Sequence, residues 1–508
     1  MGEGDTRTRA AVDRARRRSP ATLAAAIAAL LLLPLLLVPI IVLWLPASRQ
    51  DEEAPREGLA PRGFPLEAID SAATLMRREV AERAFPGAVL AAGIGPFRLA
   101  LTGVGRLEWS PTSPPVSPDS TEYDLASLSK AVATTSAVLL LVQDGRIRLD
   151  DPVRRWLPEF YGRWKEEVTW RHLLTHTSGL PPAGHMSGDT PAERLAGLMR
   201  TRLDTPPGTE VQYSDVGYIV LWAAAQRAAG EPLPRFLERR IWRPLGMRHT
   251  GYLPGLGCTT CAPTLMLSDG QPFRGKPSDP MARALGGIAG NAGLFSSATD
   301  LGRFAAMVAS GGSLNGVRIF RDDIARGLLT QQPHAGRRTL GWDTFCPAEE
   351  AVASVPCRHP VAYGHFGWTG TSLWVDPARR LWVVLLANRS YDVLHPKSMQ
   401  AVRVGVFATL AGERLDTAAA APRTTGTAPA ADATRASSRP AGALATAPPA
   451  RARPAARAHA RAHGRTPRTA LAKARRGERK RAAAPGHTTR DARAHHRAHG
   501  RARARPRA

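Results

Sequence analysis

Between residues 66 and 107 the pattern of apolar and polar positions changes from a helical to an extended period. Residues 66–83 contain neither Pro nor Gly, and their apolar residues recur with a helical spacing, so this segment is expected to form a helix. Residues 88–94 and 97–107 are short, mainly apolar runs close together in the chain, which predicts two paired strands. The body of the protein therefore begins with a helix followed by two strands.

Helix and strand patterns continue to the far end of the body. Helical stretches follow up to about residue 250, residues 372–388 form two apolar runs around an Asp-Pro turn, and residues 397–411 have the pattern of a closing helix. Strands near both ends, with helices between them, predict an α+β fold in which both ends contribute to one antiparallel sheet flanked by helices. The helices in the middle of the body are expected to form a helical subdomain.

The first 65 residues differ from the body, which spans residues 66–411. Residues 1–20 are rich in arginine, and residues 21–46 are almost wholly apolar. A membrane span needs about 20 apolar residues, whereas the core of a cleaved signal peptide has about 7–15. We therefore expect residues 21–46 to form a transmembrane signal-anchor helix, residues 1–20 to lie in the cytoplasm, and residues 47–65 to be a linker. A long cleaved signal peptide is the alternative, and both place the body on the periplasmic or extracytoplasmic side of the cell membrane.

The C-terminal segment 412–508 consists mostly of Ala, Arg, Pro and His. Residues 451–508 alone contain 19 Lys and Arg against two acidic residues, which accounts for about 17 of the formal net charge of +26. With almost no large apolar residue, the segment is expected to be disordered. It could bind an anionic polymer or extend into solvent without a dedicated partner. Nucleic acid is not the expected partner, because the segment lacks aromatic residues for base stacking and the body is expected to be exported.

The body contains four cysteines, Cys258, Cys261, Cys346 and Cys357. An even, low count in an exported chain favours one or two structural disulfides, although the spacing does not establish their pairing. Cys258 and Cys261 form a C-x-x-C motif, which could instead be half of a zinc or redox site. The ten residues between Cys346 and Cys357 are poor spacing for the other half of a zinc site.

A lone lysine in the apolar segment 121–141, TEYDLASLSKAVATTSAVLLL, indicates catalytic chemistry. Ser127 and Lys130 are three residues apart, and such residues share a face of a helix. A serine needs a neighbouring base to become a good nucleophile, and burial favours the neutral form of a lysine, which is a base. If Ser127 opens the helix, its hydroxyl also lies at the positive end of the helix dipole. The two residues are therefore a candidate nucleophile and activator, although Ser-x-x-Lys alone often occurs by chance.

Other segments give this candidate pair more weight because they occur with it in one order. The set is DLASLSK (124–130), VTWRHLLTHTSGL (168–180), YSDVGY (213–218), IWRPLGMRHTGY (241–252) and GHFGWTGTSLWVDP (364–377). The ordered set resembles the serine β-lactamase and penicillin-binding-protein superfamily. It is most similar to the branch that contains class C β-lactamases, DD-peptidases and related esterases. The resemblance covers about residues 66–411, which is nearly the whole body.

This resemblance implies a role for each matching residue. Ser127 would be the nucleophile that is acylated, and Lys130 would be its activating partner. Tyr213 would carry the serine proton to the leaving group and would act again in deacylation. A tyrosine does this only if a nearby cation lowers its pKa, and Lys130 is the expected cation. The resemblance implies neither a cofactor nor a metal.

His365, Phe366 and Gly367 occupy the place of the K-T-G or H-x-G motif of that superfamily. Their strand would form the edge of the site. The backbone N–H of Trp368 would then join that of Ser127 in an oxyanion hole, a pair of donors that stabilises the negative charge of the tetrahedral intermediate.

Three departures from the superfamily pattern bear on the substrate. Asp215 replaces the asparagine of the Y-x-N motif, and a carboxylate only accepts hydrogen bonds where an amide also donates. Beside Lys130 it would favour the charged ammonium and repel anionic substrate groups. Phe366 removes a hydroxyl that would hold a substrate carboxylate, and His365 replaces a fixed positive charge with a titratable one. We therefore expect a less anionic substrate, such as an ester or amide, instead of a β-lactam or a D-Ala-D-Ala peptide.

Several of these residues also have purely structural interpretations. Taken alone, Tyr213 is more often a core tyrosine, and His365 is more often a structural strand residue. His172 and His176 are four residues apart, as metal ligands can be, but no third ligand is apparent and no metal is expected. The glycine-rich segment 285–297 lacks the lysine and the spacing of a phosphate loop, so we expect it to pack beside the site.

The sequence therefore predicts a membrane-anchored, exported serine hydrolase. It would cleave an ester, an amide or a peptidoglycan-derived or D-amino-acid peptide substrate through a Ser127 acyl-enzyme. Two alternatives follow from the same features. If Asp215 slows acylation, the body is a penicillin-binding or peptidoglycan-binding module with little turnover. If the main function lies in the basic segment 412–508, the protein is a tether to the cell wall and the body is its scaffold.

Overall fold

The computed structural model describes residues 56–57, 66–255, 257–266, 270–347, 350, 355–391 and 399–413. The expected anchor at 21–46 and its arginine-rich flank lie outside these residues, as do most of the linker and nearly all of the basic C-terminal segment. Within the described part of the chain, no helix is both long and apolar enough to cross a bilayer.

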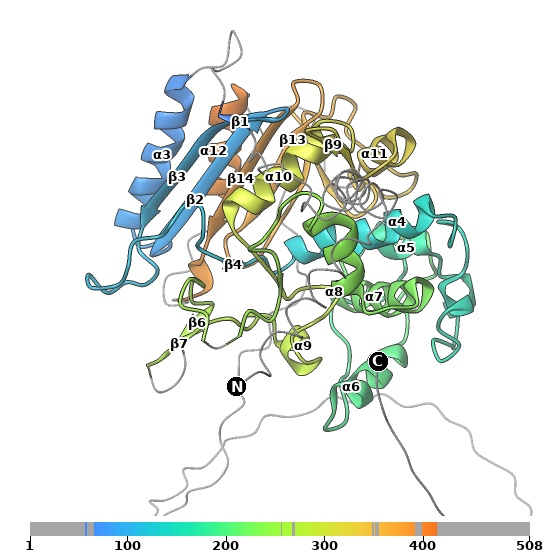
Figure 1. The fold of residues 1–508 in the computed structure, drawn as a ribbon. Coiled ribbons are helices and arrows are strands. Elements are labelled where there is room, and N and C mark those ends of the chain that lie inside the picture. Colours follow the sequence, from blue (N-terminus) through green and yellow to red (C-terminus); the bar gives the residue numbers. More distant parts are fainter. Residues whose placement is uncertain are drawn as a thin grey trace, which may run out of the picture. The chain divides into compact units, whose positions relative to one another are not determined.

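A seven-stranded sheet forms the centre of the body (Figure 1). In spatial order its strands are β1 (Arg56–Glu57), β3 (Phe97–Gly105), β2 (Gly87–Ile94), β14 (Leu381–Ala387), β13 (Ser372–Asp376), β12 (Ala362–Phe366) and β11 (Asp343–Phe345). All neighbours pair antiparallel except β1 and β3, which are parallel. Strand β14 pairs with β2, so the two ends of the body meet in the middle of the sheet. This confirms the α+β fold and the antiparallel sheet expected from the sequence.

Helices cover both faces of this sheet. Helix α3 (Leu66–Ala81) and α12 (Met399–Ala411) pack on one face, where they share a core with alternate residues of β2 and β14. Helix α10 (Ala298–Ala309) packs on the other face against the intervening residues of the same strands (Figure 1). The alternation follows from the period of two in a strand, since successive side chains point to opposite faces.

One close packing contact explains a glycine in the central strand. The Trp382 ring lies over Gly93, where an added Cβ would come within 2.4 Å of the ring and within 2.1 Å of the Phe97 carbonyl oxygen. The Trp382 indole N–H donates to the Gly95 carbonyl at 3.0 Å. Any larger residue at position 93 would therefore separate the strands β2 and β14.

The middle of the chain forms the expected helical subdomain beside the sheet (Figure 1). Its helices are η1 (Lys130–Thr135), α4 (Ser136–Gln143), η2 (Val153–Arg155), η3 (Lys165–Glu167), α5 (Trp170–Leu174), α6 (Pro191–Met199), α7 (Asp215–Ala229), α8 (Leu233–Leu237) and η4 (Glu238–Trp242). The later short helices are α9 (Pro280–Ala284), α11 (Asp322–Leu328) and η6 (Arg389–Tyr391). One apolar core joins these helices to α10 and to the sheet face that α10 covers.

Short strands fix the segment that leads into the first helix of the subdomain. Strand β8 (Leu294–Ser296) pairs antiparallel with both β4 (Tyr123–Asp124) and β5 (Gly251–Tyr252). The pair β9 (Ser313–Leu314) with β10 (Val317–Arg318) and the pair β6 (Leu265–Met266) with β7 (Pro272–Phe273) form two further hairpins. Because β4 ends three residues before Ser127, its pairing with β8 anchors the chain on one side of that serine.

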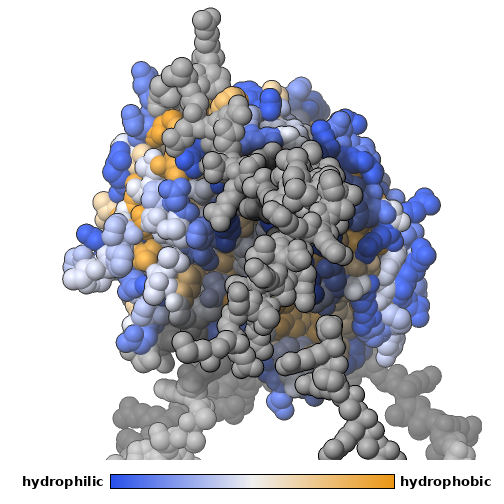
Figure 2. All heavy atoms as spheres, viewed as in Figure 1, coloured by the Kyte–Doolittle hydropathy of each residue, from blue (hydrophilic) through white to orange (hydrophobic). Residues whose placement is uncertain are grey.

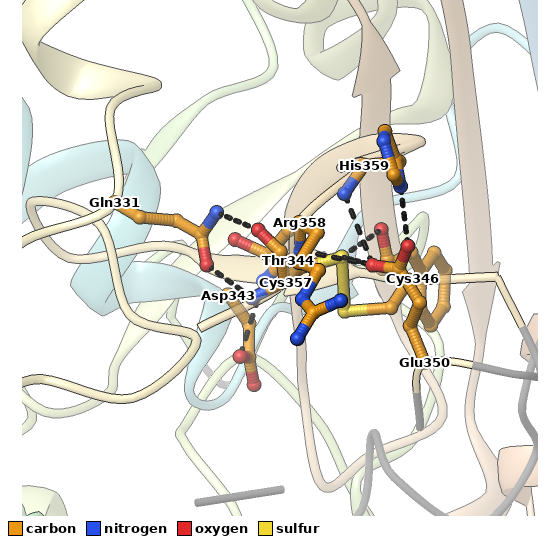
Figure 3. Close-up of a disulfide and its surroundings, with 9 residues drawn as sticks. Gln331, Asp343, Thr344, Cys346, Glu350, Cys357, Arg358 and His359 are labelled. Carbon is orange, nitrogen blue, oxygen red and sulfur yellow. Dashed lines mark hydrogen bonds and ion pairs between the residues drawn. A yellow bond between two sulfur atoms is a disulfide. The ribbon is translucent and has the colours of Figure 1, made fainter. Parts of the chain in front are cut away.

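The four cysteines form two disulfides, Cys258–Cys261 and Cys346–Cys357, as the structural interpretation of the sequence expected. The sulfurs of the C-x-x-C motif are bonded to each other, so in this state they are not the free thiolates that a zinc ion binds. Figure 3 shows that the second disulfide is held by Gln331, whose side-chain amide donates to the Cys357 carbonyl and accepts from the Cys357 N–H, both at 2.8 Å. The Glu350 carboxylate accepts from the backbone N–H groups of Arg358 and His359 beside it (Figure 3).

The surface on the side shown in Figure 2 is mostly hydrophilic, with apolar residues scattered over it. Trp368, which follows the strand β12, is one of the few large apolar side chains of the described residues that are well exposed, at 49%.

Candidate active site

A strained turn presents Ser127 at the start of a helix. Ala126 has a φ of +46°, a left-handed conformation that is costly for any residue with a Cβ. The buried Asp124 carboxylate holds this turn, because it accepts from the Ala126 N–H at 2.9 Å and from the N–H and hydroxyl of Ser278 at 2.7 and 2.8 Å. Helical structure begins at Leu128, so Ser127 lies directly before the first helical residue.

The Lys130 ammonium lies at the centre of a buried cluster. Its Nζ is 2.9 Å from the Ser127 Oγ, 2.9 Å from the Asn291 carbonyl oxygen and 2.6 Å from the Asp215 Oδ1. The contact with Asp215 is an ion pair, and Tyr213 is a further partner of this ammonium. The side chain of Lys130 is fully buried, whereas Ser127 is partly accessible. The predicted Ser127–Lys130 contact is therefore present in the structure.

The charge state of Lys130 differs from the simplest expectation. Burial alone would lower the pKa of Lys130, which is why the sequence suggested a neutral base. The contacts with Asp215 and Tyr213 outweigh burial, and the net pKa lies above the ordinary value of 10.5. The sequence did anticipate that Asp215 would favour the ammonium form, and the 2.6 Å ion pair confirms this. Lys130 is therefore a cation at neutral pH.

Tyr213 lies just before helix α7, with its hydroxyl in hydrogen-bonding contact with the side chains of both Lys130 and Ser127. The Lys130 Nζ is 4.9 Å from the centre of the Tyr213 ring. Burial raises the pKa of Tyr213, and this outweighs the lowering by Lys130. Lys130 therefore acts on the Tyr213 pKa in the expected direction, but burial keeps the net pKa above its ordinary value. Tyr213 is a neutral phenol in the resting site.

His176 positions Tyr213, a role that the sequence did not reveal. Its ring centre lies 4.4 Å from that of Tyr213, and its Nδ1 accepts from the Ser214 N–H at 3.0 Å. Ser214 in turn caps helix α7, because its hydroxyl oxygen accepts from the Gly217 N–H at 2.8 Å. Burial lowers the pKa of His176 well below its ordinary value, so it is neutral. His172 lies apart from this contact and accepts from the Thr169 N–H at 3.3 Å in a capping box of α5.

His365 is the penultimate residue of strand β12 and is 6% exposed. Its Nδ1–H donates to the Phe366 carbonyl at 2.8 Å. Burial, followed by the charges of Arg338 and Lys130, lowers the pKa of His365 to about 3. The sequence suggested a titratable charge here, but the imidazole stays neutral throughout the physiological pH range. Its ring centre is 6.2 Å from that of Tyr213, so the strand does lie beside the site.

The loop after β12 is tied to the turn before Ser127. The hydroxyls of Thr369 and Thr371 donate to the carbonyl oxygens of Asp124 and Leu125, at 2.6 and 3.1 Å. Gly367 lies against Leu125 so closely that an added Cβ would be 2.3 Å from the Leu125 carbonyl oxygen.

This connection brings the two expected oxyanion donors into one region. The backbone N–H groups of Ser127 and Trp368 have no acceptor within the described chain, as an oxyanion hole requires before substrate binds.

Three arginine side chains lie near strand β12 and the loop that follows it. The Arg338 guanidinium lies 5.5 Å from the Tyr213 ring centre and 3.5 Å from the Asp343 carboxylate. Arg403 of α12 is buried and donates to the Gly367 carbonyl, and burial lowers its pKa to about 9. The Arg389 guanidinium lies 5.4 Å from the Trp368 ring. The sequence gave no signal for these positions, because they come from three separate parts of the chain.

Acceptors gather on the opposite side, near α7 and α9. Asn291 belongs to the glycine-rich segment that was expected to pack beside the site, and it does so: its carbonyl binds Lys130 and its Nδ2 donates to Asp279 at 3.0 Å. Asp279 also accepts from the Ala282 N–H at the start of α9, at 2.6 Å.

Comparisons with known proteins agree with this geometry. The sequence model of the family described as Beta-lactamase matches residues 72–404, which is most of the chain. The chain belongs to the beta-lactamase family. This beta-lactamase-family chain is 30% identical over 309 residues to a protein of Salmonella agona described as "Putative D-alanyl-D-alanine carboxypeptidase", covering 54% of the chain and 72% of that relative.

Solved structures show the same fold. A beta-lactamase/D-alanine carboxypeptidase from Pseudomonas syringae superposes with a TM-score of 0.53 at 20% identity, over 68% of this chain and 98% of that one. The crystal structure of SurE with D-Leu superposes with a TM-score of 0.51 at 25% identity, over 68% and 76%. Membership of the beta-lactamase family, together with the carboxypeptidase relatives, makes the protein a serine hydrolase.

Proposed function

We propose that the protein is a membrane-anchored, exported serine hydrolase that cleaves esters or amides, including those of D-amino acids, through an acyl-enzyme on Ser127. The observation that carries this proposal is the 2.9 Å contact between the Ser127 Oγ and the Lys130 Nζ, next to the Tyr213 hydroxyl. A neutral serine gains reactivity when neighbouring groups remove its proton and stabilise the developing negative charge.

In the proposed acylation, the Ser127 Oγ bonds to the substrate carbonyl carbon. Tyr213 accepts the serine proton while its own proton passes to the leaving oxygen or nitrogen, and the bond from the carbonyl carbon to that atom breaks. A phenol that gives and takes protons in this way needs no resting phenolate, which fits its raised pKa. Lys130, as an ammonium, stabilises negative charge on the Ser127 Oγ and on the Tyr213 hydroxyl oxygen.

The same groups would serve deacylation. Water attacks the acyl carbon, Tyr213 takes its proton and returns one to Ser127, and the free acid leaves. The N–H groups of Ser127 and Trp368 would hold the carbonyl oxygen in both steps, and losing one such donor typically costs about 10²–10³ in rate. Every proton and bond is accounted for by substrate, water and these side chains.

The substrate class follows from the site and its relatives. Phe366 and a neutral His365 offer no hydroxyl and no positive charge at the K-T-G position, which supports an ester or amide. The described carboxypeptidase of Salmonella agona and the SurE complex with D-Leu support a D-amino acid on one side of the cleaved bond.

A second function has one specific observation in its favour. Lys130 is paired with Asp215 and donates to Ser127 and Asn291, and its pKa is raised. If acylation needs a neutral lysine, the site would react slowly and serve as a penicillin-binding or peptidoglycan-binding module. Attachment to the membrane through residues 21–46 and contact of the basic segment 412–508 with an anionic polymer are further parts of the proposal, supported by their composition.

One experiment separates these possibilities. The full-length protein in detergent is assayed with p-nitrophenyl acetate, nitrocefin and a D-Ala-D-Ala peptide, in parallel with Ser127→Ala. We expect ester hydrolysis, little or no nitrocefin turnover, and loss of activity in the variant. Labelling by fluorescent penicillin without hydrolysis of any of the three would favour the binding module. Ester hydrolysis that is undiminished in Ser127→Ala would refute the proposed nucleophile.

A further inference from the structure

The part of the site formed by Asp215 presents hydrogen-bond acceptors and lacks donors for substrate. The Asp215 Oδ1 is buried against Lys130 at 2.6 Å, while the side chain as a whole is 27% exposed. Because Oδ1 is buried, the accessible part of this side chain lies away from Lys130. Among the described residues Lys130 is the cation paired with this carboxylate, so its accessible side can accept a hydrogen bond from a bound molecule.

Two neighbours extend this acceptor wall. Asp279 lies close enough to Asp215 for the two negative charges to act on each other: burial first, then Asp215, raises the pKa of Asp279. Asn291 bridges Lys130 and Asp279 through its carbonyl and its Nδ2. It is fully buried, and its Oδ1 has no hydrogen-bond partner among the described residues.

The acceptors of this wall are only partly satisfied by the protein. The Lys130 ammonium is shared between this wall and the Ser127 and Tyr213 hydroxyls. The Arg283 guanidinium acts on Asp279. Asp279 is held by the Ala282 N–H and the Asn291 Nδ2, whereas the Asn291 Oδ1 and the Asp215 Oδ1 have no hydrogen-bond donor among the described residues. A ligand that brings a positive charge and several N–H donors would satisfy these groups, whereas a substrate carboxylate or carbonyl would add to the repulsion.

We propose that Asp215 and its neighbours form a subsite for a protonated amino group of the substrate, next to the carbonyl that Ser127 attacks. The substrate would then be an ester or amide of an amino acid or peptide whose ammonium group is free. This inference rests on the proposed function and narrows its substrate class. It assigns Asp215 a direct contact with substrate in addition to its ion pair with Lys130.

A competition assay with two small amides tests the subsite. D-alaninamide carries an ammonium group at pH 6.5, because α-amino groups have pKa values of about 8. D-lactamide has nearly the same size but carries a neutral hydroxyl. Each amide is titrated against p-nitrophenyl acetate hydrolysis by the full-length protein in detergent. A charge-assisted hydrogen bond typically gives about tenfold or more in affinity, so D-alaninamide should inhibit at a concentration about tenfold lower.

Variants identify the residue responsible. Asp215→Asn replaces the acceptor by an amide of the same shape and should bring the inhibition ratio of the two amides to within about twofold of unity. Asp323→Asn removes an exposed carboxylate that pairs with Arg321, and it should leave the ratio unchanged. If Asp215 acted only through Lys130, Asp215→Asn would change the ester rate and leave any preference between the amides intact.

Equal inhibition by the two amides in the wild type would overturn the inference, and this result needs no variant to fold. A preference that survives in Asp215→Asn would overturn it too. A separate result would show that the proposed function is wrong: ester hydrolysis that persists in Ser127→Ala. In that case titration calorimetry with the same two amides still measures the ammonium preference and its dependence on Asp215.

Discussion

Replacing Asp215 by asparagine should expose the role of the Lys130 charge in the pH dependence of catalysis. The perturbation removes a carboxylate whose Oδ1 is 2.6 Å from the Lys130 Nζ and keeps the shape of the side chain. Coulomb's law with an effective dielectric constant of about 20 gives about 6 kcal/mol for two unit charges at this separation, and breaking a buried pair typically costs about 3–5 kcal/mol. A pKa unit corresponds to about 1.4 kcal/mol.

These magnitudes set the size and the sign of the effect. In the wild type the pKa of Lys130 is raised, so the ammonium persists across neutral and moderately alkaline pH. The stability that its ion pair contributes is present below the ordinary lysine pKa of 10.5 and is lost as pH rises through the higher folded-state value. In Asp215→Asn the Lys130 pKa falls, and a loss of about 3–5 kcal/mol corresponds to about 2–4 pH units. Loss of the ammonium should therefore begin about 2–4 pH units lower than in the wild type.

The assay is the pH profile of kcat/KM for p-nitrophenyl acetate between pH 6 and 10, with the Ser127→Ala rate subtracted as background. We expect a flat wild-type profile from about pH 7 to 9.5, and a fall within this range in Asp215→Asn, because the charged lysine is the active form. A wild-type rate that rises tenfold per pH unit across this range would show that the neutral amine is active and would refute this reasoning. An unchanged alkaline limb in the variant would refute it as well.

Three other predictions follow from single residues. The folded-state pKa of His365 is lowered to about 3, so below about pH 6.5 the unfolded chain binds a proton that the folded chain excludes. The free energy of unfolding therefore falls as pH drops, by up to about 1.4 kcal/mol per pH unit. His365→Asn should flatten the pH dependence of Tm. Gly367→Ala places a Cβ 2.3 Å from the Leu125 carbonyl oxygen, so the loop that carries the Trp368 N–H should shift and kcat/KM for the ester should fall about 10²–10³-fold. An unchanged rate would contradict that placement. Ala126, with φ +46°, should tolerate glycine, whereas Ala126→Val should lower the free energy of unfolding by about 1–3 kcal/mol in denaturant titrations.

The sequence predicted those parts of the fold in which the signal is local. The helical period of residues 66–83 and the paired runs at 88–107 appear as α3, β2 and β3, and the Asp-Pro turn separates β13 from β14. The contact between Ser127 and Lys130 was also predictable, since a helical turn brings residues three apart together.

Contacts between residues far apart in the sequence were harder to predict. The place of Tyr213 beside Lys130 came only from the ordered motifs of a known superfamily, because the two residues are 83 positions apart in the sequence and no local pattern connects them. The Asn291 contact with Lys130 uses a backbone carbonyl, which any residue could provide. The packing of His176 on Tyr213 depends on a buried loop conformation with φ +59°.

Charge states were the least predictable feature. Burial and charge act in opposite directions on both Lys130 and Tyr213, and only the distances decide which effect is larger. A lysine among apolar residues suggested a neutral base, whereas the 2.6 Å contact with Asp215 makes it a cation. The residue types were visible in the sequence, but their separations were not.

The central claim, that Ser127 forms a covalent acyl intermediate, has a direct test. The full-length protein is mixed with p-nitrophenyl acetate, quenched in acid within the first turnovers, and analysed by intact mass and peptide mapping. We expect the mass of one acetyl group on the peptide that carries Ser127, and none in Ser127→Ala or on the exposed hydroxyls of the same digest. Rapid turnover by the wild type with an acetyl group on another residue, or with no covalent species at any quench time, would contradict the account.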